Sequence, residues 1–184
     1  WAGLDTSGNT WKCVFCHTAH QNTITAPPLW NHTLNTTTSY GVYDNSTFDG
    51  SATIADIGGG TSVSNLCMSC HDGTIAIGSL YNDPPTTPNS PVLGAVDSNI
   101  GLNLTDDHPV NFDYTAGLAV TDGELISPTS LDAVDAAGIL PLFGGTGSLQ
   151  CATCHDPHAD VVAFPALLTV NNNASALCLS CHVK

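Results

Sequence analysis

The chain contains no arginine and only two lysines, Lys12 and Lys184, against 16 acidic residues, so its formal net charge is −14 at pH 7. A surface of this charge repels phosphate backbones and anionic headgroups, which makes nucleic acid and anionic membranes poor partners. Long apolar runs are lacking too. The longest, residues 161–170, contains Pro165 and falls short of the ~18 residues of a membrane span. The sequence therefore predicts no membrane span.

What the chain does have is cysteine in one fixed pattern. All eight cysteines belong to four Cys-x-x-Cys-His motifs, at residues 13–17, 67–71, 151–155 and 178–182. This is the spacing of c-type haem attachment, in which two thiols add to the porphyrin vinyl groups and the adjacent imidazole binds the iron. The sequence predicts four haem c groups per chain, covalently attached to Cys13, Cys16, Cys67, Cys70, Cys151, Cys154, Cys178 and Cys181.

Paired cysteines also occur in zinc sites, redox dithiols and disulfide scaffolds. Zinc ribbons require the cysteine pairs but not a histidine directly after each pair. With 8 histidines in 184 residues, four such histidines by chance have a probability on the order of 10⁻⁶ to 10⁻⁵. A disulfide scaffold would have no cysteine left outside the motifs. The pattern favours haem attachment over all three alternatives.

The histidine count matches the demand of four six-coordinate irons. Four histidines close the motifs and are predicted proximal ligands: His17, His71, His155 and His182. The other four are predicted distal ligands: His20, His32, His108 and His158. The one methionine, Met68, lies between two attaching cysteines, which disfavours Met/His ligation. An ordinary surface or core imidazole is the alternative for each distal histidine, and the matching count favours ligation.

Local context supports three of the four distal histidines. His20 and His158 each follow a proximal histidine by three residues, so each is better placed to reach a neighbouring haem than its own. His108 precedes Pro109, which biases it towards the extended backbone of a ligand presented from a loop. His32 has the weakest local signal.

Complete bis-histidine ligation favours one class of function. Enzymes that reduce small molecules at haem need an open or weakly held iron position. With every iron saturated, outer-sphere electron transfer remains, and the protein fixes distances and tunes potentials. We therefore predict an electron-transfer protein and not an enzyme. A multihaem oxidoreductase with one labile distal ligand, His32 first, is the less favoured alternative.

The chain contains 17 glycines and 11 prolines, and few of its segments show helical periodicity. The predicted fold is mostly coil with short helices and few short strands, wrapped around a stacked haem chain. Helices are expected at 11–19, 64–71, 130–138, 150–156 and 175–182, and strands at 110–114 and 161–169. A proline-rich segment, residues 83–88, divides an N-terminal dihaem module, 1–88, from a C-terminal one, 89–184, as parts of one continuous unit.

The composition also indicates a compartment. The surface is expected to be rich in Thr, Ser, Asn and Gly, a composition common in exported proteins. Because the chain begins at Trp1 without a basic leader, we expect a mature form whose signal peptide has been removed. Haem attachment follows export. Glycosylation is weakly signalled by five Asn-x-Ser/Thr sequons, which start at Asn31, Asn35, Asn45, Asn103 and Asn173.

Three stretches resemble the doubled CxxCH multihaem cytochromes. They are Cys151–His182, with its Cys-x-x-Cys-His-Asp-Pro-His opening, Leu66–Ala76, and Asp106–Val110. The motif order with four haems looks most like the OmcE-type extracellular cytochromes, and the likeness covers most of the chain. It implies bis-His haems, stacked alternately in parallel and T-shaped pairs, and a backbone that is mostly coil.

The resemblance also implies assembly. Members of that group polymerise into extracellular filaments, or nanowires, with a continuous haem chain along the axis. In related filaments a histidine just after the first motif ligates a haem of the next subunit, and His20 is the matching residue. The expected partners are further copies of the chain, with redox proteins or extracellular acceptors. A monomeric periplasmic tetrahaem shuttle is the alternative, with the same haems and ligands.

Overall fold

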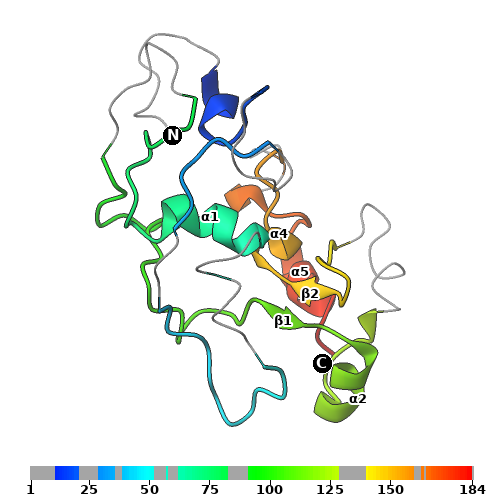
Figure 1. Cartoon of the computed structure of the whole chain (residues 1–184). Helices are drawn as coiled ribbons and strands as arrows, with labels where there is room; N and C mark the ends of the chain where they lie inside the picture. Colours follow the sequence, from blue (N-terminus) through cyan, green and yellow to red (C-terminus); the bar gives the residue numbers. More distant parts are fainter. Residues whose placement is uncertain are drawn as a thin grey trace. The chain divides into compact units, whose positions relative to one another are not determined.

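The computed structural model describes residues 11–20, 29–35, 39–51, 57, 62–82, 91–128, 140–159, 163 and 165–183. Along these ranges most residues lie in coil and turns (Figure 1). The helical elements are η1 (Trp11–Phe15), α1 (Val63–His71), α2 (Ala116–Asp122), α4 (Cys151–Cys154), η4 (Pro165–Leu167), η5 (Asn173–Ser175) and α5 (Ala176–Leu179), and the strands are β1 (Phe112–Asp113) and β2 (Ser148–Leu149). The predicted fold class, mostly coil with short helices and few short strands, is confirmed.

The chain divides into two compact units. One comprises Trp1–Gly41 with Ala55–Leu104, and the other comprises Val42–Ile54 with Thr105–Lys184. Each unit holds two of the four motifs. The expected boundary at 83–88 lies outside the described residues, so the modules 1–88 and 89–184 stay a prediction.

In the first unit, helix α1 carries the second motif. Its N-cap is Ser62, whose hydroxyl oxygen accepts a hydrogen bond from the Asn65 amide at 3.2 Å. This bond satisfies one of the amides that a helix start leaves without a partner. Leu66 and Met68 are buried on its inner face. The helix thereby anchors Cys67 and Cys70 on a regular, packed element.

A short segment, residues 29–33, connects the two motifs of the first unit through the backbone. Its amides and carbonyls pair with residues 16 and 18 on one side and with residues 79 and 81 on the other, in the bonds Thr18–Leu29, Asn31–Cys16, Thr33–Ser79 and Tyr81–Asn31, all of 2.8–2.9 Å. The side chain of Asn31 adds a bond to the carbonyl of Val14, inside the first motif. The first motif is therefore held to the chain that follows the second.

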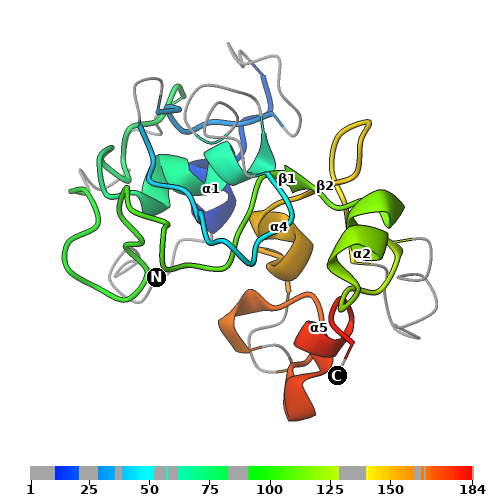
Figure 2. The ribbon, with the colours of Figure 1, turned by 90° about the horizontal axis from the view of Figure 1, so that it is seen from below.

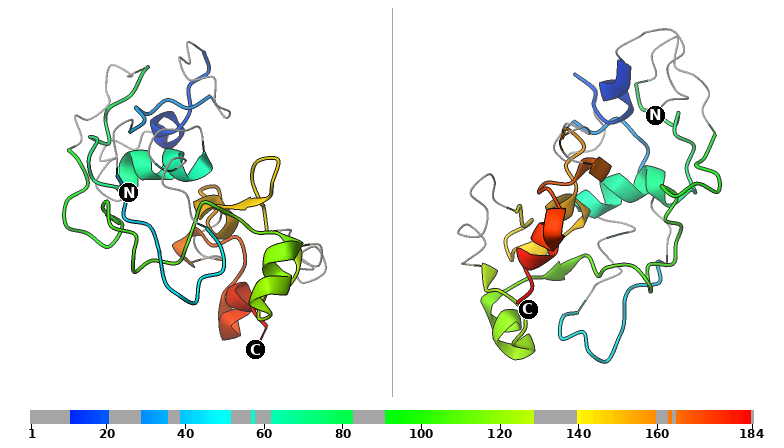
Figure 3. Two further views of the ribbon diagram at one scale, coloured as in Figure 1. Left: turned by 60° about the horizontal axis from the view of Figure 1, so that its bottom comes forward. Right: turned by 180° about the vertical axis from the view of Figure 1, so that it is seen from behind.

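The second unit is built on a two-stranded antiparallel ladder. Phe112 pairs with Leu149 and Asp113 with Ser148. Phe112, Tyr114 and Leu149 form its buried apolar cluster. Figure 3 shows β2 running into α4, so the ladder positions the third motif.

Helix α2 begins after Thr115, whose side chain accepts from the Leu118 amide, and ends at Gly123, which has a φ of 77°. Only glycine adopts this left-handed conformation freely, and glycine is common there at helix ends. Beyond it the C-terminal segment runs alongside, and the Val183 amide donates to the backbone carbonyl of Glu124 at 2.7 Å (Figure 2). The fourth motif is thus attached to the end of α2. Within the described ranges, no helix is long and apolar enough to cross a membrane.

Helices form at all four motifs but are shorter than expected at 11–19, 150–156 and 175–182, and the expected strand 110–114 is reduced to β1. The expected helix 130–138 lies outside the described residues. The prediction of a strand at 161–169 is wrong for the residues of that range that the structure describes. Pro165–Leu167 form a 3-10 turn with positive φ at Ala166, and only Leu168 makes a bridge, to His155.

Candidate functional site

The four motifs share one local geometry. In three of them the amide of the histidine donates to the carbonyl of the first cysteine, at 2.7 Å for His17, 3.0 Å for His155 and 2.9 Å for His182. The fourth, His71, ends α1. One helical turn places residues three apart on the same face. Both thiols of each motif can therefore meet one flat porphyrin edge, as double attachment requires.

Each proximal histidine is also held by a second chain segment. His17, His155 and His182 form isolated β-bridges with Trp30, Leu168 and Leu125 respectively. The carbonyl of His71 accepts from the Ile100 amide at 2.8 Å. The backbone that carries each predicted proximal ligand is therefore fixed from two sides.

Five of the predicted axial histidines have an oxygen beside Nδ1. A hydrogen bond from Nδ1 to such an oxygen fixes the tautomer and leaves Nε2 with the lone pair that binds a metal. The acceptors and distances are Ser98 O for His71 (2.7 Å), Ala166 O for His155 (2.9 Å), Thr33 O for His32 (2.9 Å), Pro109 O for His108 (3.0 Å) and Asp156 Oδ1 for His158 (3.3 Å). This arrangement fits axial ligation for all of them except His32, whose Nε2 faces a second carbonyl oxygen.

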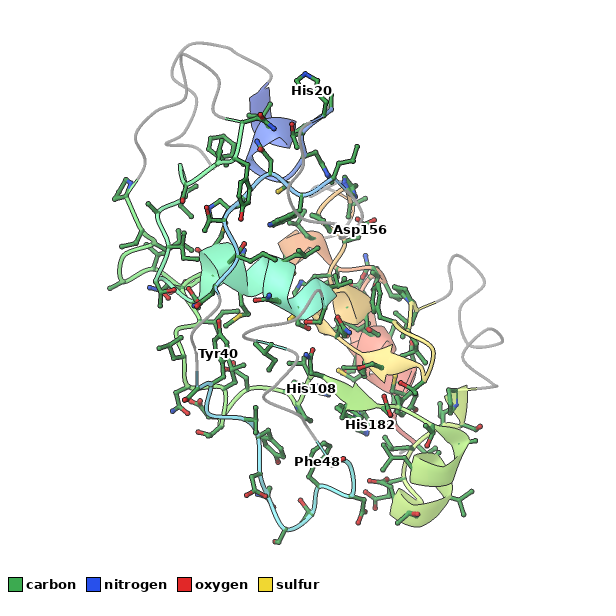
Figure 4. The ribbon with its side chains drawn as sticks, viewed as in Figure 1. His20, Tyr40, Phe48, His108, Asp156 and His182 are labelled. Carbon is green, nitrogen blue, oxygen red and sulfur yellow. The ribbon has the colours of Figure 1, made fainter. Side chains whose placement is uncertain are left out.

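The two distal candidates of the first unit differ in exposure. His32 is fully buried, with 0% exposure, and burial lowers its pKa, which keeps the ring neutral. Its Nε2 lies 3.0 Å from the carbonyl of Ala76, so ligation there requires that carbonyl to move. His20 is exposed, and in Figure 4 its ring points outward.

Trp30 lies beside the first proximal ligand. Its ring packs edge-on against His17, with centroids 6.4 Å apart and planes at 87°. Trp30 is 9% exposed, and its indole nitrogen has no hydrogen-bond partner among the described residues. A buried donor of this kind normally has an acceptor. A haem carboxylate on that side of His17 would supply one, so this part of the chain fits the group that the motif predicts.

The second unit contains a cavity of about 400 Å³. Cofactor sites are typically apolar concavities of about 300–1,000 Å³. The walls bring together the predicted attachment and ligand residues of two motifs and aromatic side chains, among them Cys154, Cys178, Cys181, His108, Phe48 and Phe112. Phe48 and Phe112 pack edge-to-face, with centroids 5.2 Å apart. Thiols, imidazoles and aromatic rings around one apolar space fit a porphyrin.

Within each unit the two motifs lie close enough for their cysteines to interact electrostatically. Burial raises the pKa of Cys70 to about 12, and the charge of Cys16 adds to the rise. Burial likewise raises the pKa of Cys154 to about 11, with a contribution from Cys181. The structure therefore pairs the first motif with the second, and the third with the fourth.

The same pKa directions bear on the alternative uses of cysteine. Redox and nucleophilic thiols have lowered pKa values, so the raised values of Cys70 and Cys154 argue against a reactive dithiol. None of the eight cysteines forms a disulfide. A zinc site needs converging ligands, and the described part of the chain holds no group of three or more His, Cys, Asp or Glu side chains placed for one.

Residues 145–184 match the doubled CXXCH motif family. This stretch contains the third and fourth motifs, and the match supports a multihaem c-type cytochrome with covalently bound haem. A family of this kind suggests electron transfer rather than catalysis. No curated protein matches the chain.

Several features of the site were not anticipated from the sequence. Sequence reasoning misses Trp30, for which an aromatic residue two positions before His32 is the available signal. The Nδ1 acceptors of four histidines are backbone carbonyls, which any residue supplies, so no sequence signal marks them. Asp156, in the Cys-His-Asp-Pro-His stretch, was the one acceptor that a side chain could have revealed.

Proposed function

We propose that this chain transfers electrons through four bis-His c-type haems, as the repeating subunit of an extracellular cytochrome filament. When bound, the haems supply reversible one-electron chemistry at iron. The observation that carries the proposal is the pairing of motifs, because each unit brings two predicted attachment sites together, and haems bound there would be within short range of each other.

The chain's own residues hold and orient these centres. One helical turn in each motif presents two thiols on one face. Backbone carbonyls of Ser98 and Ala166 orient His71 and His155 through Nδ1, so that their Nε2 atoms would be the ones to bind a metal. Eight histidines for four irons leave no ligand position for a substrate, so the proposed role is electron transfer and not catalysis.

The oxidoreductase alternative depends on a labile distal ligand, for which the sequence favoured His32. Its complete burial makes this residue a poor candidate for a ligand that must leave and return. Solvent and substrate would have to reach a ring that packing encloses. The buried position favours a permanent ligand.

The polymer is supported by the OmcE-type resemblance and by the exposed ring of His20. Exposed apolar side chains also gather in one segment of the first unit, at Val92, Val96, Ile100 and Leu102, which are 39–52% exposed. Apolar groups clustered on a surface favour contact with another protein. A chain with a net charge of −14 has few cations with which to recognise partners, so such contacts suit a polymer better than a charge-guided shuttle.

The purified protein tests the proposal directly. Haem quantitation should give four per chain, absorption and magnetic spectra should show low-spin iron throughout, and electron microscopy should show filaments. Single particles with the same spectra would identify the monomeric shuttle. A high-spin signal from a quarter of the haem would identify the oxidoreductase alternative.

A further inference from the structure

We propose that His108 and His182 are the two axial ligands of a single haem, the one attached to Cys178 and Cys181. The inference rests on the proposed function, since it assumes that the motifs carry haem. It adds which distal histidine serves which motif, a pairing that spacing along the chain leaves open. The two histidines are 74 residues apart (182 − 108).

The separation of the two rings is the first argument. Their centroids lie 6.4 Å apart, with the ring planes at 77°, and Figure 4 shows both side chains in the same part of the second unit. Imidazole nitrogens bind metals at about 2.0–2.1 Å, and each nitrogen lies about 1.1 Å from its ring centroid. Two imidazoles on opposite faces of one metal therefore have centroids roughly 6.3 Å apart. The observed spacing matches that arrangement.

A T-shaped aromatic contact would give a similar separation, since such pairs span about 4.5–7 Å. The surroundings distinguish the two interpretations. Both rings line the cavity of about 400 Å³, and Cys178 and Cys181 line the same cavity. His108 and His182 are exposed residues, so open space and not packed protein surrounds them. An aromatic pair formed for packing alone would be expected in a filled core.

Both histidines are held in place by their own chain segments. The Nδ1 of His108 donates to the carbonyl of Pro109 at 3.0 Å, which leaves Nε2 to bind a metal. His182 is fixed through its β-bridge to Leu125 and through the hydrogen bond that its backbone amide donates to the Cys178 carbonyl. The hydroxyl of Tyr114 donates to the carbonyl of Ile126 and also lies 3.3 Å from the carbonyl of Cys181. The backbones that carry the two rings are therefore held in place on both sides.

The other predicted ligands of the second unit compete poorly for this position. His155 and His158 do not line the cavity, and the side chain of His158 is 74% exposed. Cys154 of the third motif does line it, so a haem of that motif is the rival partner for His108. The experiment must therefore separate one shared iron from two different irons.

The number of haems whose spin state changes distinguishes one shared iron from two different irons. His108→Ala and His182→Ala should each convert one of the four haems from low-spin to high-spin or water-bound iron, measured by electron paramagnetic resonance. If the two residues share an iron, the double variant should still alter one haem of four. Two altered haems would overturn the pairing. His108→Ala with His155→Ala is the matched control, and it should alter two.

A second route keeps the ligand position filled in case the alanine variants fold poorly. His108→Met should raise the midpoint potential of one haem, because Met/His ligation raises haem potentials. In a trihaem chain carrying Cys178→Ala and Cys181→Ala, the same substitution should leave the three remaining potentials unchanged. A shifted potential in that background assigns His108 to another haem. Fewer than four haems in the unaltered protein would overturn the proposed function itself and the pairing with it.

Discussion

The hydroxyl of Tyr40 donates to the carboxylate of Asp72 at 2.7 Å inside the first unit. Asp72 directly follows the proximal ligand His71 and is only 4% exposed. Asn35 donates to the same oxygen at 2.5 Å, and the amide and hydroxyl of Thr74 both donate to the other oxygen at 2.8 Å. A single buried carboxylate thus joins three chain segments at the end of the helix that carries the second motif.

Replacing this carboxylate should destabilise the protein. In Asp72→Asn one acceptor oxygen becomes an NH₂ group, which faces donors and leaves them without partners. Loss of hydrogen bonds to a buried charged group costs about 1–3 kcal/mol, and we expect a decrease of this size in the free energy of unfolding. Denaturant titration of the haem-loaded protein measures it. Asp44→Asn, at an exposed position, is the control and should change the free energy by less than about 0.5 kcal/mol. Equal effects of the two substitutions would contradict a clamp at Asp72.

The same carboxylate should make stability depend on acid pH. Burial raises its pKa, but the hydrogen bonds from Tyr40, Thr74 and Asn35 outweigh burial and hold the pKa below its ordinary value of 3.8. A depressed pKa means that the contribution of Asp72 is complete above pH 3.8 and is lost as pH falls through the lower folded value. Unfolding free energies measured from pH 7 to pH 2 should therefore differ least between Asp72→Asn and the unaltered protein at the acid end. A difference that grows as pH falls would show that the sign is wrong.

Asp156 should tune the haem that His158 serves. Its carboxylate lies 3.3 Å from Nδ1 of His158, and a carboxylate at that position makes the imidazole a stronger donor to iron. Asp156→Asn removes the charge and weakens the bond, and both effects disfavour the ferric state. One of the four midpoint potentials should rise in a spectroelectrochemical titration. The rise should be small because the two side chains are 74% and 46% exposed and water screens them. Asp97→Asn, also an exposed charge, is the control, and a fall in potential in Asp156→Asn would refute the tuning.

Much of the fold was predictable because the motif itself requires a helical turn. The helices of the four motifs followed from the spacing of their cysteines. The turn at Pro165–Leu167 could not be predicted, since Ala166 and Leu167 adopt positive φ values of 59° and 56° that cost about 1–2 kcal/mol per residue. Tertiary contacts maintain it: Ala166 accepts from His155 Nδ1, and Leu167 accepts from the Asp156 amide at 2.7 Å. Local sequence favours a strand there, and the contacts of the third motif override it.

For the candidate site too, the sequence predicts some features and not others. Counting cysteines and histidines was enough to propose the attachment and ligand residues, because haem attachment depends on side-chain type, and their roles stay a prediction. The burial and contacts of these residues could not be predicted from the sequence. His32 had the weakest local signal and is nevertheless fully buried, because the distant segment that contains Ala76 packs against its ring. The proximity of His108 to His182 depends on the β1–β2 ladder and on the bridge between Leu125 and His182, neither of which has a motif.

Stability should depend on haem more than on the polypeptide core. Among the described residues of the second unit, the apolar cluster of Phe112, Tyr114 and Leu149 has three buried members and borders the cavity. So small a cluster offsets little of the ordering entropy of a long coil, whereas porphyrins filling the cavity would add apolar area. Chain produced without haem attachment should give the circular dichroism of a disordered protein. Cooperative unfolding of the haem-free form would show that the polypeptide alone stabilises the fold.

The last prediction concerns assembly through a shared ligand. The main-chain oxygen of His20 is held by the hydroxyl of Thr18 and the side chain of Asn82, both at 2.9 Å, while its ring is exposed. An anchored backbone with an outward imidazole suits a bond to the haem of another subunit, which would also continue the electron path along the polymer. His20→Ala should therefore give soluble protomers that keep four attached haems, one of them without a distal ligand.

His158→Ala is the matched control, because His158 is also exposed and occupies the same position after its motif. It should lose a distal ligand and still polymerise. Electron microscopy and spin-state spectra of the two variants separate the outcomes. If His20 instead ligates the haem at Cys67 and Cys70 of its own chain, His20→Ala will form filaments that contain high-spin iron. Long filaments with an unchanged low-spin spectrum would exclude His20 as a ligand altogether, since a polymer joined by a coordinate bond cannot survive removal of the coordinating ring.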